Sequence, residues 1–142
     1  MTDSTVIEIS VPTLAELCNP LKDMVWSAGR VTRADVKLAL RQNDLRSESV
    51  DPSYAPRESL SKQDHVARIA YLVKYGWNDP IQIDVGVPAL GVYVDWMIID
   101  GNHRMAAAIY RNDSTISSEI SGSILFATEI GLIYHNENSI PV

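Results

Sequence analysis

The order of apolar and polar positions along the chain predicts several short strands. Residues 6–11 (VIEISV) and 80–85 (PIQIDV) alternate apolar and polar side chains with a period of two, which is typical of half-buried strands. Residues 92–100 (VYVDWMIID) predict another strand that ends at an aspartate. Residues 119–127 (EISGSILFA) predict a further strand, with Gly122 at a bulge or at a close approach of two backbones.

The segment after Ser61 carries the clearest helix signals. Ser61 can cap the helix, Asp64 places an acid in its first turn, and Gly76 follows the last turn, where a left-handed residue is needed. His65 lies off the expected buried stripe, on the polar face. The stripe itself has the helical spacing and consists of Val66, Ile69, Ala70 and Val73.

Two further helices are expected on either side of this one. Thr32, with Asp35 in the first turn, marks the start of the first. The alanine-rich segment at residues 105–111 predicts the second. Residues 14–17 are expected to form only a short turn of structure, and the polar, proline-containing residues 41–56 a loop.

Strands that alternate with helices predict a small α/β or α+β domain with a mixed sheet and packed helices. The length of 142 residues corresponds to a single domain, and 46% hydrophobic and 21% charged residues are typical of a folded chain. The net charge of −6 disfavours sequence-independent DNA binding, which depends on clustered lysine and arginine.

The chain contains one cysteine, Cys18, so an internal disulfide and a cysteine-based zinc cluster are excluded. This favours a cytoplasmic location. The first ten residues lack the basic start and long apolar run of a signal peptide. No apolar run approaches the ~20 residues that span a bilayer, so no membrane association is expected.

The stretch WMIIDGNHRMAAAIYR changes from strand-like to helical character at Asp-Gly-Asn-His-Arg. A helix that begins at Gly101 or Asn102 exposes unpaired backbone amides at its positive end, and glycine lets a ligand approach the main chain. Arg104 adds donors suited to phosphate oxygens, and His103 adds a donor or an acid–base group. This junction therefore predicts an anion site, most naturally for phosphate.

A purely structural interpretation of the same junction is also open. Asp100 could cap the helix, Asn102 could close the turn, and Arg104 could pair with a surface acid. The tryptophans Trp26 and Trp77, like Trp96, are interpreted as packing residues rather than as base-stacking platforms.

The segment DGNHRMAAAIYR resembles the D-G-x-H-R-x-x-A-A element of the ParB/sulfiredoxin superfamily. The flanking order is also similar: a first strand, the helix SKQDHVARIAYLVKYG, the strand DPIQIDV, the strand WMIID and the motif helix. The resemblance covers about residues 6–11 and 57–110. Residues 21–56 have no counterpart and are expected to form a variable region of a single domain over residues 1–142.

The resemblance implies binding of a nucleotide, ATP or another NTP, together with Mg²⁺. Asp100 matches an acidic residue that lies near the metal and the substrate in kinase-like members. The residues that fall on the family's phosphate-contacting positions are Gly101, Asn102, His103 and Arg104 in the turn, and Lys62 and His65 on the preceding helix.

The chain also departs from this pattern. Sulfiredoxin has its reactive cysteine at the position of Asn102, so thiol chemistry is excluded at this turn. Partition proteins carry a helix-turn-helix after their nucleotide domain, and the few residues after Leu132 leave little room for one, so we do not expect their kind of DNA binding.

Two classes of function stay open. One is an enzyme that transfers or hydrolyses phosphate or cleaves nucleic acid, with His103 or a loop glutamate as base and Asp100 at the metal. The other is an inert binding or regulatory module, encoded by a phage or plasmid, that acts on a host protein.

Overall fold

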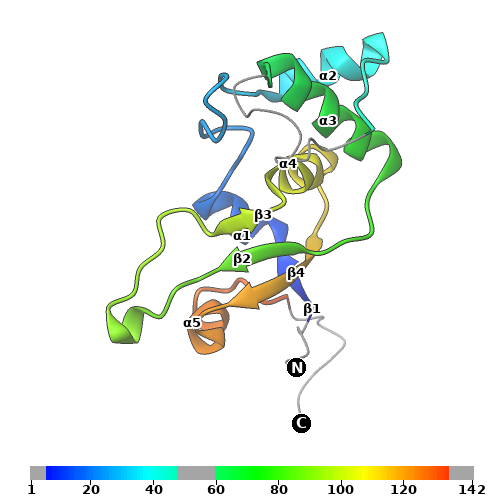
Figure 1. Ribbon diagram of the computed structural model, residues 1–142. Coiled ribbons are helices and arrows are strands. Elements are labelled where there is room, and N and C mark those ends of the chain that lie inside the picture. Colours follow the sequence, from blue (N-terminus) through cyan, green and yellow to red (C-terminus); the bar gives the residue numbers. More distant parts are fainter. Residues whose placement is uncertain (1–5, 48–59, 135–142) are drawn as a thin grey trace.

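The computed structural model describes residues 6–47 and 60–134, which form a mixed four-stranded sheet in the order β1-β4-β2-β3 (Figure 1). β1 pairs antiparallel with β4, β4 pairs parallel with β2, and β2 pairs antiparallel with β3. The expected α+β architecture with a small mixed sheet is therefore confirmed. The strands span Val6–Ser10 (β1), Ile81–Asp84 (β2), Ile98–Asp100 (β3) and Thr115–Ser121 (β4).

Helices α2, α3 and α4 form a stack on one side of the sheet, with α3 between the other two and α4 next to the strands (Figure 1). Helix α1 directly follows β1 and also contacts α4, whereas α5 lies at the opposite end of the molecule from α2 (Figure 1). Every helix in the described part of the chain is too short or too polar to cross a membrane. The helices span Val11–Leu17 (α1), Arg33–Gln42 (α2), Lys62–Tyr75 (α3), Asn102–Arg111 (α4) and Ile124–Glu129 (α5), and a 3₁₀ turn, η2, spans Pro88–Leu90.

The two helix starts expected from capping residues are confirmed. Ser61 accepts a hydrogen bond from the amide of Asp64 at 3.2 Å, and the Asp64 carboxylate accepts one from the amide of Ser61 at 2.9 Å. Thr32 and Asp35 form the same reciprocal pair at the start of α2. These boxes satisfy amides that the first helical turn leaves without partners. Gly76 ends α3 as expected and has a positive φ of +78°, but its ψ of −168° lies outside the expected left-handed region.

Helix α4 is the central element of the core. Its alanines, Ala106, Ala107 and Ala108, are each 0% exposed, because α1, α3 and the sheet surround the helix. Their small side chains allow α3 and the strands to approach α4 closely. The isoleucines Ile81 and Ile83 on β2, also 0% exposed, complete the sheet side of this core.

The region expected to be one strand over residues 119–127 divides into two elements, so that prediction is wrong in part. β4 begins at Thr115 and ends at Ser121, and Ser123 then caps α5 by accepting a hydrogen bond from the amide of Phe126 at 3.1 Å. Gly122 separates the two elements with φ of +95°, and a Cβ there would lie 2.6 Å from the carbonyl oxygen of Gly86. The expected close backbone approach at Gly122 is therefore confirmed.

Three other boundaries differ from the expectation. The strand expected over 92–100 is confined to Ile98–Asp100, because Val92 instead pairs with Val87 across η2. The short turn expected at residues 14–17 is a complete helix, α1, capped by Ser10. In the loop expected over 41–56, the first two residues belong to α2, and residues 48–56 lie outside the described chain.

Candidate functional site

The start of α4 follows directly on β3, at the junction that the sequence pattern singled out. Gly101 occupies the N-cap with φ of +111° and has no side chain to cap the helix. Its carbonyl oxygen accepts the amide of Met105 at 2.8 Å, which begins the helical pattern. The amides of residues 102–104, by contrast, have no acceptor within the described part of the chain. The helix therefore presents free donors at its positive end.

Glycine is required at this position for two reasons. A left-handed φ is strained for residues that carry a Cβ. In addition, a Cβ on Gly101 would lie 2.4 Å from Cγ2 and 2.7 Å from Cβ of Ile81 on β2. The backbone of the turn thus packs directly against the strand, which fixes where the helix begins.

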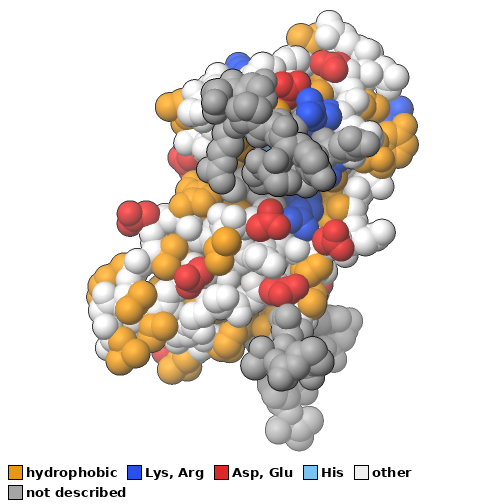
Figure 2. Space-filling view, in the orientation of Figure 1, with side chains coloured by type: hydrophobic (Ala, Val, Ile, Leu, Met, Phe, Trp, Pro, Cys, Tyr) orange, Lys and Arg blue, Asp and Glu red, His pale blue; other side chains and the backbone are white. Residues whose placement is uncertain are grey.

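A cleft of about 510 Å³ opens in front of this helix start. Its size falls in the range of small-molecule sites. Figure 2 shows acidic and basic side chains close together across the middle of the visible face. The cleft is lined by residues from α3, the α3–β2 connection, β2, the β3–α4 junction and β4, namely Arg68, Leu72, Trp77, Asp79, Pro80, Gln82, Asp100, Gly101, His103, Arg104 and Glu119.

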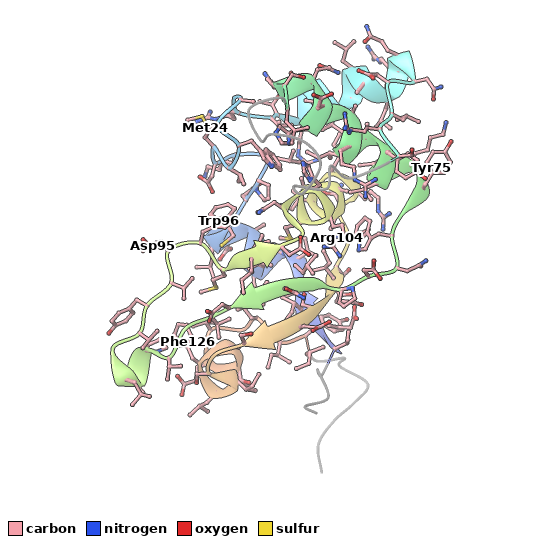
Figure 3. The ribbon with its side chains drawn as sticks, in the orientation of Figure 1. Met24, Tyr75, Asp95, Trp96, Arg104 and Phe126 are labelled. Carbon is pink, nitrogen blue, oxygen red and sulfur yellow. The ribbon has the colours of Figure 1, made fainter. Side chains whose placement is uncertain are left out.

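Arg104 lies between α4 and the sheet (Figure 3) and is held by the protein itself. Its Nη1 donates to the carbonyl oxygens of Asp79 at 3.0 Å and Pro80 at 2.9 Å. Its Nη2 lies 3.3 Å from Oδ2 of Asp100, and the Arg104 side chain is only 16% exposed. Arg104 therefore ties the start of β2 to the helix start, and its positive charge stays fixed beside the cleft.

Three polar residues form a row across the sheet at the wall of the cleft. Gln82 on β2 is the register partner of Asp100 on β3 and of Glu119 on β4. The row carries two carboxylates and one amide, and the Asp100 side chain is 68% exposed. Together with Asp79, these acids outnumber the two arginines of the lining, Arg68 and Arg104.

Two histidines meet at the inner end of the site. Nδ1 of His65 on α3 lies 2.9 Å from Nε2 of His103 on α4. The indole of Trp26 stacks on both imidazoles, with centroid distances of 4.9 and 4.8 Å. Burial, followed by the nearby charges of His65, Arg68 and Arg104, lowers the pKa of His103 to about 3. Burial likewise lowers the pKa of His65.

The position of His65 corrects one expectation. His65 is 7% exposed rather than on a solvated face of α3, because Trp26 and α4 cover that side of the helix. It contacts the cleft only through His103, since His65 is not among the lining residues. The hydrophobic spacing within α3 could not predict that Trp26 covers His65, because Trp26 is distant from α3 in the sequence.

Two other expected phosphate contacts lie elsewhere. Lys62 is not in the cleft lining, and its Nζ lies 3.3 Å from Oδ2 of Asp35, so it forms an ion pair between α3 and α2. The side chain of Asn102 accepts a hydrogen bond from Nε1 of Trp96 at 2.9 Å. Asn102, like Lys62, is not among the residues that line the cleft.

A magnesium ion fits this site only as a companion of phosphate. The described residues contain no group of three or more histidine, cysteine, aspartate or glutamate side chains that could hold a metal ion. Asp100 is the exposed carboxylate nearest the helix start, and one of its oxygens already faces Arg104. Ions that the protein holds through a single carboxylate usually take their other ligands from substrate phosphates and water.

Several lining residues were not singled out by the sequence pattern. Gln82 and Glu119 reach the cleft through the register of three strands, which no local signal reveals. Arg68 could have been found from the sequence, because it follows the candidate residue His65 by about one turn of α3. Cys18 is buried and accepts a hydrogen bond from the amide of Met97 at 3.3 Å, in keeping with a structural role.

Comparisons of the chain with protein-family models, with curated proteins and with solved structures found no match.

Proposed function

We propose that the protein is a nucleotide-binding domain of the ParB/sulfiredoxin type, with the phosphates of ATP or another NTP at the start of α4. The observation that carries this proposal is the set of amides of residues 102–104, which lack acceptors in the described chain and lie beside a cleft of about 510 Å³ that Gly101, His103 and Arg104 line. Helix starts of this kind bind phosphate through their amides and their dipole.

The charges of the lining support a nucleotide that carries Mg²⁺. Arg68 and Arg104 provide positive charge, but Asp79, Asp100 and Glu119 surround them. A bare polyphosphate would be repelled by these acids, whereas a magnesium complex brings its own positive charge. Asp100, which is exposed, would face the metal, and the amides would face the phosphate oxygens.

A binding role is better supported than a catalytic one. General bases work best when their pKa lies near the operating pH. His103 has a pKa of about 3, and its Nε2 is hydrogen-bonded to Nδ1 of His65. His103 therefore accepts a further proton poorly at neutral pH. The module would then act through a bound nucleotide on another protein, for example a host protein if the chain is encoded by a phage or plasmid.

Phosphotransfer or nuclease activity is the second candidate function. The exposed carboxylate of Asp100, at the edge of the cleft, favours it, because a carboxylate beside phosphate can orient a metal ion. In this case Asp100, and not His103, would be the residue on which activity depends.

Isothermal titration calorimetry tests nucleotide binding. Wild-type protein is titrated with MgATP, with the other magnesium NTPs and with magnesium tripolyphosphate. Arg68→Gln removes a charge from the cleft and should weaken binding roughly tenfold, in line with the strength of a charge-assisted contact. The matched control is Arg41→Gln, in the last turn of α2 and outside the cleft lining, which should bind as wild type. The absence of binding by any of these ligands to the wild type would refute the proposal.

Incubation with labelled ATP and with plasmid DNA, each with Mg²⁺, separates the two candidates. A binding module leaves both unchanged over hours. An enzyme turns one of them over, and Asp100→Asn should then abolish turnover, whereas Asp95→Asn should not because Asp95 lies outside the cleft lining.

A further inference from the structure

The lining of the cleft includes apolar residues that phosphate alone would not use. Leu72, Trp77 and Pro80 supply the apolar side chains of the lining, and all the other side chains that line it are polar or charged. Pockets for small organic ligands combine apolar and aromatic surface with a few polar groups. The composition of the lining therefore fits a ligand that has both an anionic and a flat apolar part.

Trp77 is held in place from one side. The guanidinium carbon of Arg111 lies 4.7 Å from the centroid of the indole. Arg111 is fixed in turn by Asp113, with Nη2 2.7 Å from Oδ2 and Nε 3.3 Å from Oδ1. A stacked guanidinium and its ion pair restrict the rotation of the ring. Trp77 is partly exposed, so the protein does not cover it completely.

Trp77 also lies within reach of a ligand bound at the start of α4. The carbonyl oxygen of Asp79 accepts a hydrogen bond from Arg104, which belongs to the first turn of α4. Two residues of extended chain span at most about 7 Å, so the backbone of Trp77 lies close to this contact. A phosphate at the helix start and a base near Trp77 can therefore belong to one nucleotide.

We propose that Trp77 is the stacking platform for the nucleobase, so that the ligand is a nucleoside triphosphate rather than an inorganic polyphosphate. This inference rests on the proposed function. Trp77 packs against the core, as the sequence indicated, and the inference adds a ligand contact on its exposed part. The face of the indole opposite Arg111 contacts the base. Gln82 and Glu119, which share the lining, face the sugar and the base edge with one amide and one carboxylate.

The test compares a nucleotide with its phosphate chain alone. Magnesium ATP, magnesium CTP and magnesium tripolyphosphate are titrated into wild type, Trp77→Leu and Trp77→Phe. Loss of base stacking is worth about 1–3 kcal/mol, so Trp77→Leu should weaken binding of one or both nucleotides by about five- to 150-fold. Tripolyphosphate should bind Trp77→Leu as it binds wild type, and Trp77→Phe should retain most of the nucleotide affinity.

The matched control is Tyr75→Leu, which removes an exposed aromatic ring two residues away that does not line the cleft. It should leave all three affinities unchanged. If Trp77→Leu does not fold, the indole N–H resonance of Trp77 in the wild type still decides the question. That resonance should shift strongly with ATP or CTP and weakly with tripolyphosphate.

The outcomes separate the two proposals. If tripolyphosphate binds and nucleotides bind no more tightly, the base-stacking role is refuted and the phosphate site stands. If Trp77→Leu weakens nucleotide and tripolyphosphate equally, the role of Trp77 is structural. If neither kind of ligand binds to the wild type, both proposals fail.

Discussion

His65 and His103 are 38 residues apart in the chain, yet their ring nitrogens Nδ1 and Nε2 lie 2.9 Å apart beneath the indole of Trp26. One ring must donate and the other accept, so the tautomer of each histidine determines that of the other. His65 is buried and His103 is partly buried, and burial lowers the pKa of both rings, so protonation of the pair opposes folding.

The stability of the protein should therefore fall on mild acidification. The pKa of His103 is lowered from 6.5 to about 3, so below pH 6.5 the unfolded chain binds a proton that the folded chain does not. Stability is fully present above pH 6.5 and decreases as the pH falls toward 3, by up to about 1.4 kcal/mol per pH unit for each such proton. Urea denaturation at pH 7, 6 and 5 measures this decrease.

The two carboxylates with a lowered pKa, Asp35 and Asp64, do not obscure that window. The pKa values of Asp35 and Asp64 lie below 3.8, because burial of each carboxylate is outweighed by cap hydrogen bonds. They therefore affect stability only in stronger acid. His103→Gln should flatten the decrease between pH 7 and 5, and an equal decrease in this variant would show that other groups cause it.

The close packing of Gly101 predicts a large effect of Gly101→Ala. The added Cβ would clash with Ile81 at 2.4 Å, and φ of +111° is strained for alanine. We expect a loss of about 2–4 kcal/mol in the free energy of unfolding, together with weaker nucleotide binding. Gly91→Ala is the control, because its φ of +78° carries similar strain but no atom lies within 4 Å of the added Cβ. Similar losses in the two variants would mean that the contact with Ile81 is unimportant.

Asp100→Asn should change the affinity for MgATP and the affinity for metal-free tripolyphosphate in opposite directions. Binding of MgATP should weaken several-fold, because the carboxylate expected to face the metal is lost. Binding of tripolyphosphate without Mg²⁺ should strengthen, because a negative charge 3.3 Å from Arg104 disappears. Calorimetry with Mg²⁺ and with a chelator distinguishes the two, and weakening in both conditions would contradict a metal role for Asp100.

Lys62→Ala should leave nucleotide binding unchanged. Lys62 pairs with Asp35 and does not line the cleft, and an exposed pair of this kind contributes about 0–1 kcal/mol. Asp35→Ala should destabilise more, by about 1 kcal/mol, because it also removes half of the capping box of α2. A loss of nucleotide affinity in Lys62→Ala larger than in Arg68→Gln would show that Lys62 reaches the ligand after all.

Features encoded by neighbouring residues could be predicted from the sequence. The caps at Thr32 and Ser61 and the junction at Gly101 each depend on a few adjacent positions, and each helix starts where these residues indicate. The boundary between β4 and α5 was not predicted, because the apolar segment ILFA is compatible with either a strand or a helix. Ser123, which caps α5, makes this segment helical.

The wall of the cleft depends on contacts that no local pattern contains. Gln82 and Glu119 become neighbours only through the parallel pairing of β2 with β4. In the same way, the burial of His65 follows from Trp26 lying across α3 and α4. The helix start could thus be located from the sequence, whereas the surroundings that give it selectivity could not.

The complete burial of Ala106, Ala107 and Ala108 has a consequence for recognition. A helix enclosed on every side has little freedom to tilt or slide, because its neighbours already touch the small side chains. Its leading amides are thus preorganised, and an incoming molecule meets donors whose spacing and direction do not adapt. Selectivity at this end of the helix would therefore come from a fixed arrangement of donors, and not from donors that adjust to each ligand.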